Sequence, residues 1–125
     1  MAEHDLSVLL KTLTVKRHEG VWAFEVCDEP GDLDRAAMAF REAEGWTLIQ
    51  PATEATVADN RWAWLELAVF SDLNAVGFLA VVADALAKAD VPCNAVAAFH
   101  HDHIFVPIAK ADAAIAALTD LSKGS

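Results

Sequence analysis

Residues 61–70 read Arg-Trp-Ala-Trp-Leu-Glu-Leu-Ala-Val-Phe, and they give the clearest strand pattern in the chain. Its apolar side chains recur with a period of two, which is typical of a β-strand because successive side chains point to opposite faces of a sheet. One face carries Ala63, Leu65, Leu67 and Val69, and the other carries Trp62, Trp64, Glu66, Ala68 and Phe70. Both faces are largely apolar, so we expect both to be covered.

A helix is expected directly after this strand. Residues 75–88 are rich in alanine, valine and leucine, and Asp84 and Lys88 are spaced four residues apart, so they share one solvent-facing stripe. Ser71 and Asp72 precede this segment, and a side-chain oxygen at either position can accept hydrogen bonds from the unpaired amides of the first turn. A helix this apolar needs cover on two sides.

The remainder of the second half predicts a hairpin and a final helix. Residues 92–99 and 104–108 have the pattern of two strands, and the polar residues 100–103 predict the turn that joins them. After Pro107, apolar residues with helical spacing predict a last helix. The order is therefore β-α-β-β-α, which becomes a ferredoxin-like unit when one more strand is added from elsewhere.

The first half is less regular, and one of its segments leaves two alternatives open. Its expected elements, in chain order, are a short helix, a strand and a solvated acidic loop, over residues 5–13, 21–26 and 27–34. The apolar spacing of residues 33–44 favours a helix that ends at Gly45, but the same segment can form a hairpin between residues 37–41 and 46–50. Residues 53–60 predict a brief helix or turn. No glycine- or serine-rich linker separates the halves, so we expect one continuous sheet.

Composition limits the partners and the compartment. With 125 residues, of which 55% are hydrophobic, the chain fits one domain or two small ones that share a core. Nineteen acidic residues against nine basic ones give a net charge of −10, which repels nucleic acid and anionic membranes. The start of the chain lacks the pattern of a secretory signal, so we expect a cytoplasmic protein in which Cys27 and Cys93 are free thiols.

Three stretches carry specific motifs. Residues 41–48 read REAEGWTL, residues 71–77 read SDLNAVG, and residues 94–107 read NAVAAFHHDHIFVP. They resemble the E-x-E-G-x-T-L, S-S-L-E-A-V-G and N-V-V-A-G-Y-x-H-D-H-x-F-V-P segments of a family of small bacterial proteins built from two tandem ACT-like domains. The chain departs from that pattern at Asp72, Asn74, Ala98 and Phe99.

This resemblance implies an α+β fold with ferredoxin-like ACT domains in tandem, a shared antiparallel sheet and helices on one face. Residues 1–60 would form an N-terminal ACT-like half and residues 61–125 a C-terminal ACT domain. Related proteins have a β-hairpin at the E-x-E-G segment, so the resemblance favours strands there, against the local helix propensity.

The resemblance also implies a non-catalytic regulatory protein that binds a small molecule, expected to be an amino acid. Amides at the start of the helix would attract its carboxylate, and Asp72 or Asn74 would receive its ammonium group. Gly77 would let a ligand come close to the backbone. The expected ligand-binding residues are Ser71, Asp72, Leu73, Asn74, Ala75, Val76, Gly77, Asn94, His101 and Asp102.

Other functions are weaker alternatives on this sequence. The chain has no nucleophile elbow, phosphate-binding loop or dinucleotide fingerprint, so we expect neither an enzyme nor a cofactor. A structural or partner-docking module without a ligand is one alternative. Metal binding at residues 100–103 is another, in which His101 and His103 converge and need help from Cys93, His18 or another chain. An uncovered aromatic strand face would favour a homodimer.

Overall fold

The computed structural model describes residues 3, 5–69 and 71–124 of the chain. The helices are α1 (Leu6–Thr12), α2 (Phe78–Lys88) and α3 (Ala111–Lys123), with short 3-10 turns η1 (Ala58–Asn60) and η2 (Ile108–Lys110). The strands are β1 (Val15–Arg17), β2 (Trp22–Cys27), β3 (Met38–Glu42), β4 (Gly45–Pro51), β5 (Trp62–Leu67), β6 (Asn94–Ala97) and β7 (Asp102–Pro107). This mixed α+β fold agrees with the class predicted from the sequence.

Across the described residues, seven strands form one sheet in the order β3-β4-β2-β5-β7-β6, and β1 also pairs with β5. Every strand pair is antiparallel. The strand that completes the ferredoxin-like order of the second half is β1, because it pairs with the edge of β5 that β7 leaves free. A strand from the N-terminal segment therefore completes the ferredoxin-like unit of the second half.

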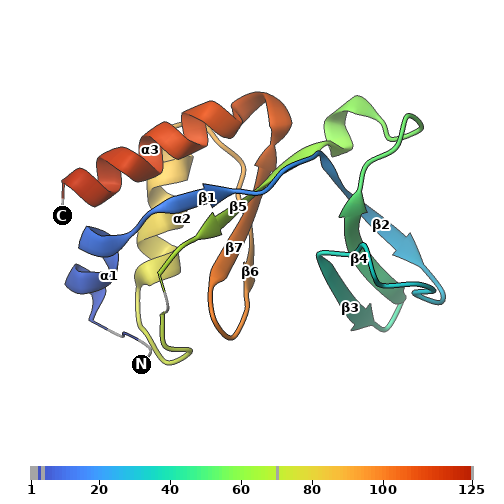
Figure 1. Ribbon diagram of the computed structural model, residues 1–125, viewed down its shortest axis with the longest axis horizontal. Helices are drawn as coiled ribbons and strands as arrows, with labels where there is room; N and C mark the ends of the chain where they lie inside the picture. Colours follow the sequence, from blue (N-terminus) through green and yellow to red (C-terminus); the bar gives the residue numbers. More distant parts are fainter. Residues whose placement is uncertain (1–2, 4, 70, 125) are drawn as a thin grey trace.

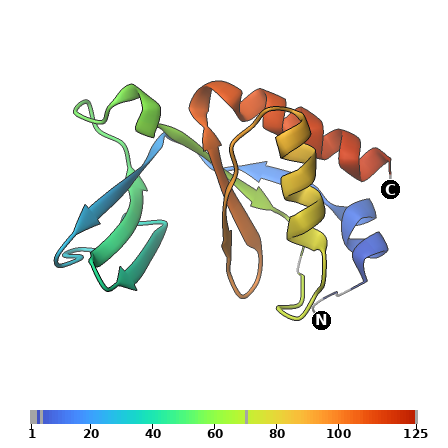
Figure 2. The ribbon, with the colours of Figure 1, turned by 180° about the vertical axis from the view of Figure 1, so that it is seen from behind.

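The sheet bends between two lobes (Figure 1). One lobe contains β1, β5, β7 and β6 with α1, α2 and α3 on one face; the other contains β2, β3 and β4 with the short turn η1 and, among the described residues, no α-helix. The connection is thin, because β2 pairs with β5 only at Trp22 and Trp62. Figure 2 shows α2 and α3 lying side by side over the same face, which we call the helix face; the opposite face is the helix-free face.

The main core lies between the helix face and the helices. The odd residues of β5 predicted to face inward, such as Leu65 and Leu67, are fully buried. Phe78, Val82 and Leu86 cover them from α2, because residues spaced by four lie on one side of a helix. The predicted alternation of β5 is thus confirmed, and the strand ends at Leu67 instead of residue 70.

The open alternative at residues 33–44 is settled in favour of the hairpin. β3 and β4 pair through Glu42 and Gly45, as the resemblance implied. Gly45 has φ of +134°, and a Cβ there would lie 2.8 Å from the carbonyl oxygen of Cys27, so the turn needs glycine. Pairing of β4 with both β2 and β3 outweighs the helix propensity of the alanines.

Two expectations about the second half are wrong. Asp102 and His103 belong to strand β7, not to a turn, because each pairs with a residue of β5 and of β6. Ser71 and Asp72 do not cap α2, which begins six residues later with Gly77 as its N-cap. Residues 71–77 instead form a loop, which lengthens the connection between β5 and α2.

The aromatic side of β5 is covered within the chain. Trp22 packs edge-on against Trp64 with ring centroids 5.0 Å apart, and Phe24 packs likewise against Trp62 at 5.5 Å. Both partners come from β2, so the first half supplies the cover. Phe70, the third aromatic residue of the expected patch, lies outside the described residues.

Candidate functional site

A small pocket opens on the helix face where the loop after β5 meets the first turn of α2 and the β6–β7 hairpin. Its volume is about 160 Å³, roughly that of five water molecules in the liquid. We call it the loop pocket. Six of the residues expected to bind the ligand line it: Ser71, Asp72, Leu73, Ala75, Gly77 and Asp102. The structure thus brings six of the ten expected residues together at one pocket.

Asp102 is the buried charge of the loop pocket. Its residue is 7% exposed, and Ser71 Oγ donates a hydrogen bond to Asp102 Oδ2 at 3.1 Å. Burial raises the pKa of Asp102 and outweighs the Ser71 hydrogen bond and the charges of nearby histidines, which lower it. Among the described residues, no lysine or arginine forms an ion pair with Asp102. A cationic group of a ligand can therefore supply the missing partner.

Asp72 holds the shape of the loop. Its Oδ1 accepts a hydrogen bond from the backbone N–H of Asn74 at 2.8 Å, and its carbonyl accepts one from Ala75 at 2.9 Å. Its own N–H donates to the carbonyl of Glu3 at 2.7 Å, which ties the N-terminal segment to the loop. This carboxylate is engaged in the turn, so Asp102 is the better receptor for an ammonium group.

The start of α2 forms the opposite wall. Gly77 has φ of +93° and no side chain caps the helix, so the amides of the first turn remain unpaired within it. Residues of that turn, from Phe78 to Ala80, line the pocket. The positive end of the helix dipole favours a carboxylate at this position. The pocket thus offers one wall for an anion and one buried carboxylate for a cation.

Four expected site residues do not line the loop pocket. Asn74 and Val76 belong to the loop but are absent from the pocket lining, and Val76 is 84% exposed. Asn94 pairs with Phe105, and the alternation of β6 places its side chain on the helix-free face. His101 Nδ1 lies 3.8 Å from Glu66 Oε2, also away from the pocket. Their predicted role in ligand contact finds no support in the geometry.

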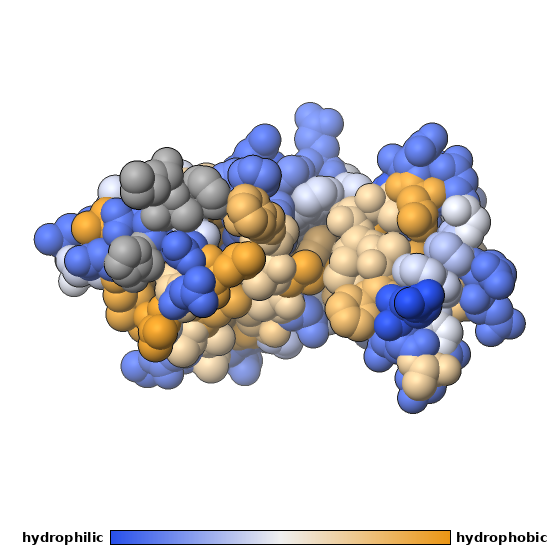
Figure 3. Space-filling model, turned by 90° about the horizontal axis from the view of Figure 1, so that it is seen from below, coloured by the Kyte–Doolittle hydropathy of each residue, from blue (hydrophilic) through white to orange (hydrophobic). Residues whose placement is uncertain are grey.

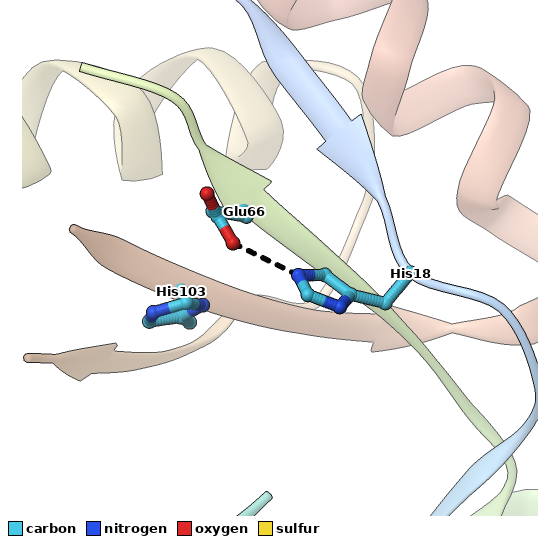
Figure 4. A group of neighbouring side chains, drawn as sticks. All are labelled: His18, Glu66 and His103. Carbon is cyan, nitrogen blue, oxygen red and sulfur yellow. Dashed lines mark hydrogen bonds and ion pairs between the residues drawn. The ribbon is translucent and has the colours of Figure 1, made fainter.

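A second cluster lies on the helix-free face. His18, Glu66 and His103 each offer a nitrogen or oxygen atom, and these atoms all lie within 4.8 Å of one another. Figure 4 shows the three side chains meeting above adjacent strands, with His18 Nε2 2.9 Å from Glu66 Oε1. We call these residues the histidine cluster. It shares no residue with the loop pocket.

Neighbouring groups fix the charge and orientation of the histidine cluster. Burial acts to raise the pKa of Glu66, but the hydrogen bond from His18 and the positive charges of the surrounding histidines lower it overall. Burial lowers the pKa of His103. The Trp64 indole N–H donates to His103 Nδ1 at 2.9 Å, and the His18 ring stacks on Trp64 with centroids 3.7 Å apart.

Sequence reasoning named two of the three histidine-cluster residues but missed Glu66. A signal was present: Glu66 is the single charged residue in a strand face that otherwise carries tryptophan, alanine and phenylalanine. A charge in such a position needs partners. Its pairing across the sheet with His103 depends on the register of β5 and β7, which local periodicity does not provide.

Two further hollows are less suited to a specific small ligand. A wide depression of about 730 Å³ in the helix-free lobe contains Arg61, but its guanidinium already donates to the carbonyls of Thr53 and Thr56. A cavity of about 90 Å³ lies between Met38 of one lobe and Trp64 of the other. Figure 3 shows apolar side chains gathered on the facing sides of the two lobes.

Within residues 3, 5–69 and 71–124, no helix has the length and apolar character required to cross a bilayer.

Two family models match the chain in tandem. A model described as an ACT domain matches residues 57–120, and a second ACT-domain model matches residues 1–61. Together they span both halves, as the motifs implied. No curated protein matches the chain in sequence.

Solved structures show the same architecture. A protein of unknown function from Vibrio cholerae, described as a possible transport protein, is 31% identical with a TM-score of 0.79, covering 94% of this chain and 95% of that one. A protein from Agobacterium tumefaciens is 13% identical with a TM-score of 0.67, covering 88% and 89%. Aspartokinase alpha and beta subunits are 10% identical with a TM-score of 0.64, covering 88% and 97%. The last two likenesses concern the fold alone.

Proposed function

The chain belongs to the ACT-domain family, and from that premise we propose that it is a non-catalytic regulatory protein that binds a small amino acid in the loop pocket. ACT domains are regulatory modules that generally bind small molecules. Their character agrees with the expectation of a protein without an active site. The amino acid and the pocket are the parts that this proposal adds.

One observation carries the proposal: the loop pocket combines an unpaired helix start with a buried carboxylate. The first-turn amides of α2 favour the carboxylate of an α-amino acid. Asp102, held by Ser71 and without a lysine or arginine partner among the described residues, favours its ammonium group. A zwitterion can interact with the helix amides and with Asp102 at once, whereas an amine or a carboxylic acid alone can interact with only one of them.

The size of the pocket selects among amino acids. At about 160 Å³ it is smaller than the roughly 300 Å³ at which pockets for drug-sized ligands begin. Phe78 and Leu79 of α2 are among the residues that line it. Glycine, alanine and serine therefore fit the proposal better than aromatic amino acids.

Thermal unfolding with a panel of amino acids tests the proposal. A ligand at a hundred times its Kd adds about 2.7 kcal/mol to the free energy of unfolding, which raises the Tm of a chain of this size by roughly 10 °C. We expect this shift with a small amino acid, and less with matched analogues that lack one charge, such as ethylamine and propionate in place of alanine.

Substitutions then locate the binding site. Asp102→Asn keeps an oxygen that accepts the Ser71 hydrogen bond but removes the charge, so the amino-acid shift should disappear. Asn94→Ala is the matched control, because Asn94 is exposed on the other face of the sheet. A shift that survives in Asp102→Asn, or that is lost in Asn94→Ala, contradicts the proposed site.

A structural or partner-docking module is the rival function. It predicts no shift with any member of the panel and no effect of Asp102→Asn beyond folding stability. A flat panel would therefore favour this rival and would remove the loop pocket as a ligand site.

We also propose that the chain divides into two ACT-like halves between residues 60 and 61, and that it forms a homodimer. The aromatic face of β5 gives no reason for a dimer, because β2 covers it, but Val26 and Phe40 of the helix-free lobe are 75% and 63% exposed. Light scattering of the eluted protein measures the mass: twice 13.4 kDa supports a dimer, and 13.4 kDa contradicts it.

A further inference from the structure

The histidine cluster has no part in the proposed amino-acid site, and it meets the requirements of a metal site. His18 directly follows β1, Glu66 lies in β5, and His103 lies in β7, so two adjacent strands and the residue after a third bring their side chains to one place on the helix-free face (Figure 4). All three residues are partly buried. These residues are separated by up to 85 positions in the chain, so the folded sheet, and not their nearness in sequence, brings them together.

Backbone pairing fixes these positions. Glu66 and His103 are direct partners in the antiparallel ladder, so their side chains lie next to each other on the same face. The N–H of His18 donates to the carbonyl of Trp64 at 3.0 Å, which anchors the third residue beside β5. The imidazole of His18 lies flat on the indole of Trp64, with an angle of 5° between the rings. The donors are held in place before any ion binds.

The chemistry of the donors selects the kind of ion. Two imidazoles and one carboxylate are an ordinary ligand set for Zn²⁺ and related divalent transition metals, whereas Ca²⁺ and Mg²⁺ prefer oxygen alone. Tetrahedral ligands about 2.0 Å from zinc are roughly 3.3 Å apart. His18 Nε2 and Glu66 Oε1 are already 2.9 Å apart, and all three donors lie within 4.8 Å, so small side-chain rotations complete the geometry.

We propose that His18, Glu66 and His103 bind a divalent transition-metal ion of the Zn²⁺ type. His101 is placed to help, because its Nδ1 lies 3.8 Å from the second oxygen of Glu66. The ion takes the place of the proton between His18 Nε2 and Glu66 Oε1. The site is separate from the loop pocket, which lies across the sheet.

Metal binding must also change the hydrogen bond of Trp64. A neutral imidazole has one lone pair, and that of His103 now accepts the indole N–H. Coordination of His103 uses this lone pair, or moves the proton to the nitrogen that faces Trp64, and either change breaks the hydrogen bond. The indole N–H resonance of Trp64 therefore reports the event directly, and Trp64→Phe assigns that resonance.

Calorimetric titration of the chelator-treated, full-length chain with Zn²⁺ tests the proposal. We expect one ion per chain and an affinity that falls more than about 100-fold in His18→Gln, Glu66→Gln and His103→Gln. His100→Gln is the matched control, because His100 is exposed and outside the cluster, and its affinity should stay within about twofold of the parent chain.

Three results would overturn the proposal. The first is no saturable binding of Zn²⁺, Co²⁺ or Ni²⁺ by the unsubstituted chain, a measurement that does not depend on the folding of any variant. The second is equal weakening by His100→Gln and His18→Gln, which would indicate scattered surface histidines. The third is saturation with an unchanged indole N–H resonance of Trp64, which would place the ion elsewhere.

Discussion

Asp102 and His103 are neighbours in the chain, yet they serve opposite faces of the sheet. Asp102 lies on the helix face beside Ser71 and is 7% exposed, in the pocket that we propose for a small amino acid. His103 lies on the helix-free face with His18 and Glu66, in a cluster suited to a metal ion. Because side chains of a strand alternate, one motif supplies residues to two sites that have no side chain in common.

The two faces of the sheet therefore use different residues of the same motif, residues 100–103. On the helix face, the loop of residues 71–77 and α2 bring backbone amides to Asp102. On the helix-free face, the residue after β1 and strand β7 each bring an imidazole to the carboxylate of β5. The proposed amino-acid site needs the start of a helix, whereas the proposed metal site needs the register of β5 against β7 and the stacking of His18 on Trp64.

The largest predicted effect tests whether β2 buries the aromatic residues on the helix-free face. Phe105 is 2% exposed and its ring contacts Phe24 and Trp64, so Phe105→Ala should lower the free energy of unfolding by about 3–5 kcal/mol. Phe40→Ala removes the same atoms from a side chain that is 63% exposed and should cost less than about 1 kcal/mol. Urea unfolding measures both. Equal losses would mean that β2 does not cover this face.

A smaller effect concerns the loop pocket. Gly77 has φ of +93°, so Gly77→Ala should lower the free energy of unfolding by about 1–2 kcal/mol. Gly31→Ala introduces similar strain at φ of +62° in a loop of the other lobe, with no atom near the added methyl group. Both variants should lose similar stability in urea, but only Gly77→Ala should lose the amino-acid shift. Loss of that shift in Gly31→Ala would contradict the comparison.

The smallest effect concerns the histidine cluster. Trp64→Phe keeps an aromatic ring beneath His18 but removes the N–H that competes for the lone pair of His103. A hydrogen bond of this kind is worth about 1 kcal/mol, so Zn²⁺ should bind roughly fivefold more tightly. Trp62→Phe is the control, because its N–H donates to Asn60 instead. If calorimetry finds that Trp64→Phe binds Zn²⁺ equally or more weakly than the parent chain, the indole N–H does not compete with the ion for His103.

The sequence predicted elements whose pattern is local. The alternation of residues 61–70 and the helical spacing up to Lys88 are visible in short windows, and both appear in the structure. Most residues of the loop pocket lie between Ser71 and Ala80, so a local motif could point to them, whereas Ala97 and Asp102 join the pocket through strand pairing. The start of α2 was misplaced, because Ser71 and Asp72 have the chemistry of helix caps but are used in the loop.

Features that depend on long-range pairing could not be predicted in the same way. Residues 33–44 have helix propensity, and pairing with two other strands overrides it. The histidine cluster requires β1 to pair with β5 and β5 to pair with β7 in one register, and a shift of one residue would separate Glu66 from His103. The motif of residues 100–103 read as a turn for the same reason.

One cross-titration tests the separation of the two faces most directly. Calorimetry measures the affinity of Asp102→Asn and of His103→Gln for the best small amino acid and for Zn²⁺. Asp102→Asn should lose at least about tenfold in amino-acid affinity and keep its Zn²⁺ affinity within about twofold, and His103→Gln should show the reverse. If either substitution lowers the affinity for the amino acid and for Zn²⁺ by the same factor, residues 102 and 103 serve a single site and the separation of the two faces is wrong.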